Sequence, residues 1–345
     1  MHTVDLRSDT VTLPTPAMMQ AIATAELGDD VFGEDPTANR LEETAARRLG
    51  KDAAILVMSG TMANLVALLA HCGRGDEIIV GDKAHIFINE AGGCSAVGGI
   101  HSHQVPNQVD GTLNLADIED AVRSDNAHYP RSRVICLENT HNRCGGACLT
   151  PGYMRQVRQV ADRHGLRIHL DGARLFNAAV ALGVDVKELT ADADSVGFCL
   201  SKGLSAPVGS LLCGSAEFIR AARRARKVVG GGTRQAGIIA AAGIVALEGM
   251  VERLADDHVN ARRLAQGMAG LPGILINPAQ VQTNIVYFDV QEQLGSAAEF
   301  CQRLAADGVR MLPTGKQTVR ALSHYGIERN DIDTALSIIA RAVAR

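Results

Sequence analysis

A lysine and an aspartate stand where an α/β protein would place reactive groups. Lys202 follows an apolar, strand-like segment, and Asp171 closes another such segment 31 residues earlier. Side chains at the carboxyl ends of strands can converge on a ligand. This pair suits pyridoxal phosphate, because an amine forms a Schiff base with it and a carboxylate pairs with its pyridine nitrogen. A lysine that ends a strand is otherwise a solvated edge residue, but Asp171, Ser201 and Gly203 favour the cofactor.

Small residues follow an earlier strand-like run and could hold a phosphate. Ser59, Gly60 and Thr61 stand where a helical pattern begins. Backbone N–H groups at a helix N-terminus bind anions, and a threonine hydroxyl adds a further donor. Because small residues also cap many helices that bind nothing, this interpretation depends on Lys202 and Asp171.

A histidine and an arginine could complete the same pocket. His85 follows the strand-like run 77–80 and could place its ring flat on a pyridine ring, although a hydrogen-bonded loop histidine is the alternative. Arg174 follows Asp171 by three residues, so one turn could carry both side chains. Arginine binds carboxylates through two parallel hydrogen bonds, as an amino-acid substrate requires.

A triple glycine with cations on either side is a further candidate. Gly230 to Gly232 lie between Lys227 and Arg234. A loop without side chains can approach an anion closely. A plain flexible turn is the alternative for this segment.

The elements that must position these residues alternate along the chain. Strand-like runs and helical patterns follow one another from residue 53 to residue 171, which predicts a mostly parallel sheet covered by helices. The next strand, 209–214, begins only seven residues after Lys202. A parallel return needs a dozen or more residues, so this strand should be antiparallel and the sheet mixed. We therefore predict a large cofactor-binding domain with an N-terminal arm over 1–245 and a small α+β domain over 246–345.

Composition narrows the class of partner. The 345 residues are 46% hydrophobic and carry a formal net charge of -4. This charge provides no positive electrostatic field that would attract nucleic acid or an anionic membrane. The longest apolar stretch, 235–247, is too short to span a bilayer, and the N-terminus lacks the apolar run of a signal peptide. The expectation is a cytoplasmic enzyme with a small-molecule substrate. The eight cysteines are scattered as buried thiols are, and Cys144 and Cys148 lack a second pair, so no metal site is predicted.

Taken together, the motifs resemble the L-threonine aldolases, pyridoxal phosphate enzymes of fold type I. The likeness runs over nearly the whole chain and rests on nine segments: 5–12, 28–36, 59–61, 84–85, 137–142, 169–174, 200–204, 230–235 and 320–324. One position departs from the family pattern. Phe32 stands where the family usually has tyrosine, so any contact of that hydroxyl is absent or made by water.

The resemblance implies a role for each matching residue. The chemistry would fall to Lys202 as the Schiff-base lysine, Asp171, His85 and His128. The cofactor would contact Gly60, Thr61, His85, Asp171, Arg174, Ser201 and Lys202, with Lys227 and Arg234 reaching it from a neighbouring subunit. The substrate would contact Ser8, His85, His128, Arg174 and Arg320. Such shared sites imply a homo-oligomer, either a dimer or a tetramer built from dimers.

The implied reaction is cleavage of L-threonine or L-allo-threonine to glycine and acetaldehyde. His128 or His85 would take the β-hydroxyl proton, directly or through a water. A β-eliminating lyase or an aminotransferase-like enzyme on the same fold is the alternative, because fold does not fix function. A nucleotide-binding module is disfavoured, since no G-x-G-x-x-G opens the first βαβ unit. An inactive homologue is disfavoured because Lys202 is present.

Overall fold

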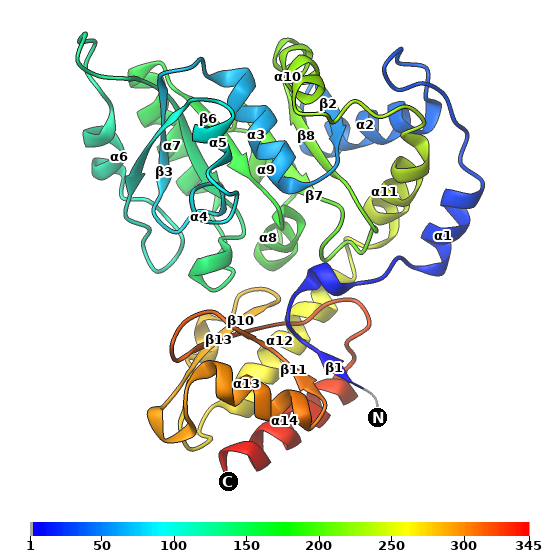
Figure 1. Ribbon diagram of the computed structural model, residues 1–345, viewed down its shortest axis with the longest axis vertical. Helices are drawn as coiled ribbons and strands as arrows, with labels where there is room; N and C mark the ends of the chain where they lie inside the picture. Colours follow the sequence, from blue (N-terminus) through cyan, green and yellow to red (C-terminus); the bar gives the residue numbers. More distant parts are fainter. Residues whose placement is uncertain (1–2, 345) are drawn as a thin grey trace.

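The computed structural model describes residues 3–344 and contains two structural units. Figure 1 shows the larger unit, with its sheet between helices, above a smaller unit made of the C-terminal third of the chain. The predicted combination of a mostly parallel, mixed sheet with a smaller α+β unit is confirmed.

The large sheet contains seven strands in the order β2-β8-β7-β6-β5-β3-β4. Their bounds are β2 Ala53–Val57, β3 Asp76–Gly81, β4 His101–Val105, β5 Arg131–Glu138, β6 Arg167–Asp171, β7 Ser195–Cys199 and β8 Ser210–Gly214. Strands β4, β3, β5, β6 and β7 are parallel neighbours. Strand β8 is antiparallel to β7, as its short connection predicts. Strand β2 is antiparallel to β8 and therefore points the same way as β7.

Helices cover both faces of this sheet, and their ends follow from local sequence. The bounds are α1 Pro16–Ala23, α2 Pro36–Leu49, α3 Gly60–His71, α4 His85–Ile88, α5 Gly93–Ala96, α6 Leu115–Ala121, α7 Pro151–His164, α8 Leu175–Leu182, α9 Val186–Thr190, α10 Ala216–Val228 and α11 Gly237–Gly249. Helix α7 begins at a Thr150 cap followed by proline, and it ends at Gly165 in the left-handed region. These are the favoured residues for helix starts and stops.

The small unit has its own apolar core and an antiparallel sheet in the order β12-β13-β10-β9. The bounds are α12 Leu254–Met268, β9 Ile274–Leu275, β10 Ile285–Val290, α13 Ala297–Ala306, β11 Val309–Arg310, β12 Leu312–Pro313, β13 Thr318–Leu322 and α14 Arg329–Val343. The predicted division at residues 245 and 246 falls inside α11 and stays a prediction. We propose that the units divide in the connection 250–253, after which α12 contributes Leu264 and Met268 to the small core.

The N-terminal arm packs on the small unit, although it precedes the large unit in sequence. Strand β1, Val4–Asp5, pairs in parallel with β11, and Val4 and Leu6 are buried in the small core. Figure 1 shows β1 beside the C-terminal helices. The short 3-10 helix η1, Asp9–Val11, then leads toward the large unit.

Two properties of the chain bear on its environment. Within residues 3–344, no helix combines the length and apolar character needed to cross a bilayer. All eight cysteines are free thiols, and six of them are buried.

We predict that the arm contributes to the stability of the small unit. Because the Leu6 side chain is 0% exposed, Leu6→Ala should lower the free energy of unfolding by about 2–5 kcal/mol in urea titrations. The matched control is Leu275→Ala, at a side chain that is 55% exposed, which should change it by less than about 0.5 kcal/mol. Equal effects of the two substitutions would contradict the packing of the arm.

Candidate active site

Four neighbouring parallel strands end at one edge of the large sheet, facing the small unit. Strand β6 ends with Asp171, and Lys202 follows β7 by three residues. On the other side of β6, strand β5 ends with Glu138, and β3 leads to His85 at the start of α4. The order β7-β6-β5-β3 therefore delivers an amine, two carboxylates and an imidazole to the same edge.

The Asp171 carboxylate is buried and held by two donors. Asn64 donates to its Oδ2 at 2.9 Å, and the backbone N–H of Ala173 donates to its Oδ1 at 3.1 Å. The same Asn64 amide nitrogen donates to Glu90 at 2.7 Å. One amide from α3 thus fixes two buried acids.

His85 is held from both its backbone and its ring. Its N–H donates to Glu138 Oε2 at 2.7 Å, and its Nδ1 lies 2.8 Å from Glu90 Oε1. The hydrogen bond to Glu90 raises the pKa of His85, although burial opposes this effect. Burial raises the pKa of Glu90. Among residues 3–344, the hydrogen bonds of the ring involve Nδ1, which leaves Nε2 open to a ligand.

His85, Glu90 and Asp171 also have the composition of a metal site, since their ligand atoms lie within 4.8 Å of one another. Asn64 already donates to both carboxylates, and Glu90 also bonds His85. These hydrogen bonds account for the close approach of the three side chains.

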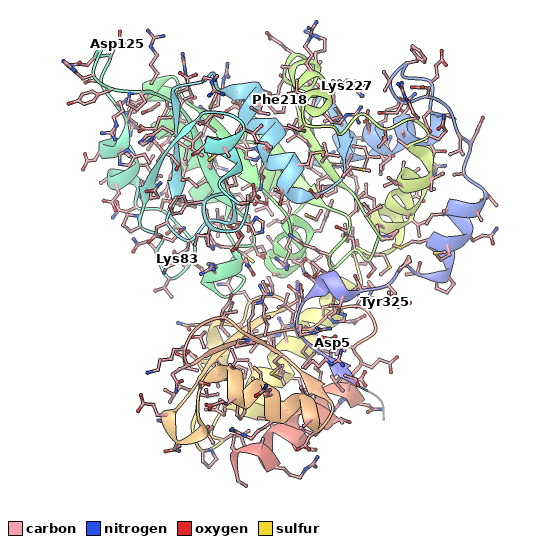
Figure 2. The ribbon with its side chains drawn as sticks, viewed as in Figure 1. Asp5, Lys83, Asp125, Phe218, Lys227 and Tyr325 are labelled. Atoms are coloured by element: carbon pink, nitrogen blue, oxygen red, sulfur yellow. The ribbon has the colours of Figure 1, made fainter. Side chains whose placement is uncertain are left out.

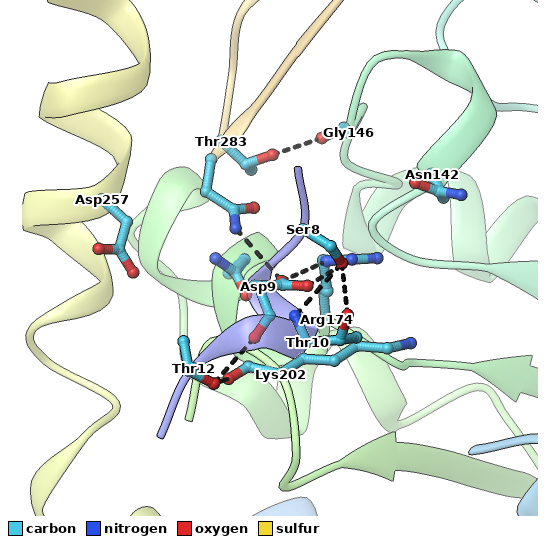
Figure 3. Close-up of polar contacts among 12 residues, drawn as sticks. Ser8, Asp9, Thr10, Thr12, Asn142, Gly146, Arg174, Lys202, Asp257 and Thr283 are labelled. Carbon is cyan, nitrogen blue, oxygen red and sulfur yellow. Dashed lines mark hydrogen bonds and ion pairs between the residues drawn. The ribbon is translucent and has the colours of Figure 1, made fainter. Parts of the chain in front are cut away.

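Lys202 lies in the loop after β7, with its backbone carbonyl fixed. That oxygen accepts from Ser205 N at 2.8 Å and from Thr12 Oγ1 at 3.3 Å. Figure 3 shows the Lys202 side chain extending beside η1 and Arg174. Within residues 3–344 no hydrogen bond engages the Lys202 amine, so the amine is available for covalent chemistry.

Arg174 and Asp9 form a buried ion pair across the two units. The guanidinium donates twice to the carboxylate, with both distances at 2.7 Å (Figure 3). Burial works against ionisation of Asp9, but the charge of Arg174 and its hydrogen bonds lower the pKa of Asp9 to about 2. The pair therefore stays charged at neutral pH and holds Arg174 at the site.

Arg320 and Ser8 reach the site from the small unit and the arm. Arg320 donates to Asn142 Oδ1 at 2.8 Å and to the Arg7 carbonyl at 3.3 Å. Among the described residues, its buried Nε has no hydrogen-bond partner. Burial and the nearby Arg174 lower the pKa of Arg320. An anionic ligand would give Nε a hydrogen-bond partner and would stabilise the charged form of Arg320.

The N-terminus of α3 lies against the end of β7. A Cβ added at Gly60 would stand 2.9 Å from Cys199 Sγ, so glycine permits this close approach. The Ser59 hydroxyl accepts a hydrogen bond from the N–H of Met62 at 3.1 Å. This capping bond does not use the N–H groups of Gly60 and Thr61. With the half-buried Ser201 after β7, these residues fit a phosphate group.

His128 lies elsewhere in the chain. It is exposed on the loop that leads into the first residue of β5. The candidate site lies at the opposite edge of the sheet, at the carboxyl ends of the parallel strands. The eight residues of β5 separate these edges by roughly 25 Å. Figure 2 shows Asp125 of this loop at the far tip of the large unit, and Lys83 near the small unit. One chain therefore does not bring His128 to Lys202.

Lys227, in the last turn of α10, and Arg234, in the segment after that helix, are both exposed. Arg234 forms an ion pair with Asp29 at 3.4 Å, and its side chain is 56% exposed. The glycine loop between the two cations packs on the first turn of α3, since a Cβ at Gly231 would meet Met62 Sδ at 2.7 Å. Lys227 packs on this loop, since a Cβ at Gly232 would stand 3.0 Å from its Cδ.

The sequence and the fold were each compared with known proteins. The family model described as beta-eliminating lyase matches residues 5–291. A probable low-specificity L-threonine aldolase 2 from Arabidopsis thaliana is 50% identical, over 98% of this chain and 96% of the relative. The low specificity L-threonine aldolase of Escherichia coli K12 is 43% identical, over 95% and 96% respectively.

The chain belongs to the threonine aldolases of the beta-eliminating lyase family. A threonine aldolase structure from Leishmania major has a TM-score of 0.83 at 21% identity, covering 99% of each chain, and this confirms the type I fold. A high-resolution structure of SPT with pyridoxal phosphate (PLP) also has this fold. It superposes on this chain with a TM-score of 0.74 at 19% identity, and the match covers 99% of this chain and 87% of the other.

Several residues that support this aldolase-family site were absent from the sequence predictions. Asp9, Asn64, Glu90 and Glu138 bond the predicted residues directly, and His169 bonds Asn64. The sequence contained weak indications of two of these residues. His169 precedes Asp171 by two residues and therefore shares its face of β6, and Asn64 stands one helical turn after Gly60.

We predict that Glu90 sets the protonation of His85. Glu90→Gln should lower the His85 pKa, because the neutral amide no longer stabilises the imidazolium. The raised pKa contributes stability that is complete below pH 6.5, the unfolded value, and is lost as pH rises through the folded pKa. The contribution of His85 to the free energy of unfolding at acid pH should therefore be smaller in Glu90→Gln than in the wild-type protein.

Histidine NMR titration of cofactor-free protein measures the His85 pKa. Glu217→Gln, at an exposed carboxylate on α10, is the control and should leave it unchanged. An unchanged or higher His85 pKa in Glu90→Gln would show that another group controls the ring.

Proposed function

We propose that this protein is a pyridoxal phosphate-dependent aldolase that cleaves L-threonine or L-allo-threonine to glycine and acetaldehyde. The observation that carries the proposal is the placement of the Lys202 amine and the Asp171 carboxylate at neighbouring strand ends. Arg174 and Arg320 lie over the same edge and supply positive charge for a substrate carboxylate. Membership in the threonine aldolases supports the choice of reaction.

We propose the following cofactor contacts. Lys202 would hold the cofactor covalently, and Asp171 would pair with its pyridine nitrogen. Gly60, Thr61 and Ser201 would bind its phosphate, and His85 would contact its ring. When bound, the cofactor supplies an electron sink beside the substrate Cα.

The substrate contacts are assigned to the small unit, the arm and the Asp171 turn. Arg174, Arg320 and Ser8 bind the α-carboxylate and so orient the Cα–Cβ bond. Such orientation can contribute several kcal/mol, roughly 7 to 11 at the limit. The Asp9 ion pair supports this role by holding the Arg174 guanidinium in one position.

The proton of the β-hydroxyl must move as the Cα–Cβ bond breaks. We assign its acceptance to Nε2 of His85, directly or through a water, because Nδ1 is engaged by Glu90. The aldehyde then leaves, and the proton accepted at Nε2 of His85, or relayed by the water, completes glycine at Cα. His128 can take part only from another copy of the chain.

A β-eliminating lyase is the second candidate, favoured by the description of the matching family model. The products separate the two reactions. Aldol cleavage yields glycine and an aldehyde, whereas β-elimination yields ammonia and a keto acid.

We further propose a homo-oligomer with shared sites, as a dimer or a tetramer of dimers. Apolar side chains are exposed on the arm and near the glycine loop, including Leu13 at 76%, Phe32 at 75% and Val228 at 80%. Burial of this surface between subunits would place Lys227 and Arg234 against a partner. The free thiols support a cytoplasmic location.

Lys202→Ala should abolish covalent attachment of the cofactor and reduce cleavage by roughly a thousandfold or more. Borohydride reduction and peptide mapping of the wild-type protein should label Lys202. Lys316→Ala, in the small unit, is the matched control and should retain activity. Label on Lys227 or Lys316 would contradict the assignment.

The shared-site proposal predicts complementation. Lys202→Ala and Arg234→Ala proteins, each inactive alone, should regain activity when their subunits exchange, up to about a quarter of the wild-type value. One site of a mixed dimer then has both intact residues, and the other has neither. Native mass spectrometry verifies the exchange. No recovery despite exchange would place Arg234 in the site of its own chain.

A further inference from the structure

A chain of hydrogen bonds crosses the core of the large unit behind the candidate site. His71, the last residue of α3, bonds through Nε2 to Ser195 Oγ at 2.8 Å. The same oxygen lies 2.9 Å from Nδ1 of His169, a ring that is 0% exposed. On the other side of that ring, Nε2 lies 3.0 Å from Asn64 Oδ1. The chain thus ends at the amide that binds the site carboxylates.

The two carboxylates decide how the Asn64 amide is turned. Its nitrogen donates to Glu90 at 2.7 Å and to Asp171 at 2.9 Å, with carboxylate oxygens as the acceptors. The NH2 group must therefore face both acids, one hydrogen to each. The amide oxygen then faces His169, whose Nε2 must carry a hydrogen.

The remaining hydrogens follow from this first assignment. Burial lowers the pKa of His169 to about 4 and that of His71 to about 3, so both rings are neutral at pH 7. A neutral His169 with its hydrogen on Nε2 accepts at Nδ1 from the Ser195 hydroxyl. The Ser195 oxygen in turn accepts from Nε2 of His71. Every donor in the chain points toward Asp171.

We propose that His169 is a positioning residue for the Asp171 carboxylate and acts on it through Asn64. The inference rests on the proposed function, in which Asp171 pairs with the cofactor. His169 and Asp171 project from the same face of β6, so one strand carries both the acid and the ring that orients its donor. If the amide turned over, its oxygen would face two carboxylates, and the Nε2–H of His169 opposes that turn.

Two substitutions of similar size separate this role from simple packing. In His169→Gln, the side-chain amide nitrogen falls near the position of Nε2 and can still donate to Asn64. In His169→Asn, the amide falls near Nδ1, so the bond to Ser195 can remain while the bond to Asn64 is lost. A residue that only filled space would not distinguish the two variants.

Pyridoxal phosphate affinity gives the first readout, by absorbance titration of cofactor-free proteins. We expect His169→Gln to bind within about twofold of wild type and His169→Asn to bind about tenfold more weakly, as when a buried polar group loses its partner. Equal affinities in the two variants overturn the proposal.

A double-mutant cycle tests the route through Asp171. In an Asp171→Ala background, His169→Asn should cause no further loss of affinity, because the group that it positions is absent. The same additional loss in both backgrounds would show that His169 acts by another route.

The ring tautomer gives a readout that needs neither cofactor nor activity. Histidine-selective 15N NMR of cofactor-free wild-type protein at pH 7 should show His169 neutral with its hydrogen on Nε2. A hydrogen on Nδ1, or a charged ring, overturns the positioning role even if the variants fail to fold. Failure of the wild-type protein to bind pyridoxal phosphate or to release glycine would instead overturn the proposed function.

Discussion

The ion pair between Arg174 and Asp9 joins the two units at the point where the site is built. Both side chains are almost completely buried, and their two hydrogen bonds satisfy charges that would be very costly to bury alone. Asp9 belongs to the arm, so the pair fixes η1 beside the loop of Lys202, which Thr12 also contacts. The arm thereby brings Ser8 to the site while its first strand stays in the small unit.

The acids of the site are arranged by the same requirement that buried charges find donors. Glu138 accepts from the backbone of His85 at 2.7 Å and from the backbone of Asn142 at 2.8 Å. Asn142 in turn accepts from Arg320 of the small unit. A carboxylate with no assigned catalytic role therefore links His85, through Asn142, to Arg320 in β13 of the small unit.

The surface of the single chain explains why some family residues lie away from the site. Phe32, the departure from the family pattern, is 75% exposed. The loss of a tyrosine hydroxyl there therefore changes the exposed surface of the single chain. His128 is also exposed, and the strands that deliver Asp171 separate it from the site edge of the sheet.

Local pattern was sufficient for much of the architecture. Apolar runs identified the strands before Asp171 and Lys202, and the start of the next strand only seven residues after Lys202 required β8 to be antiparallel. Such features depend on neighbours in sequence, whose spacing and conformational preferences can be read directly. The resemblance of the motifs then identified the family, because so many segments occur in one order.

Tertiary structure alone decided which side chains meet. Asp9 and Arg174 are 165 residues apart, and His169 and Asn64 are 105 apart. Neither distance along the chain indicates contact, because the strand order and the path of the arm bring these residues together. The sequence by itself determined the strand ends and the residue types capable of chemistry. The fold decided their partners, since a buried charge or amide must be satisfied by whichever group the packing of distant segments places beside it.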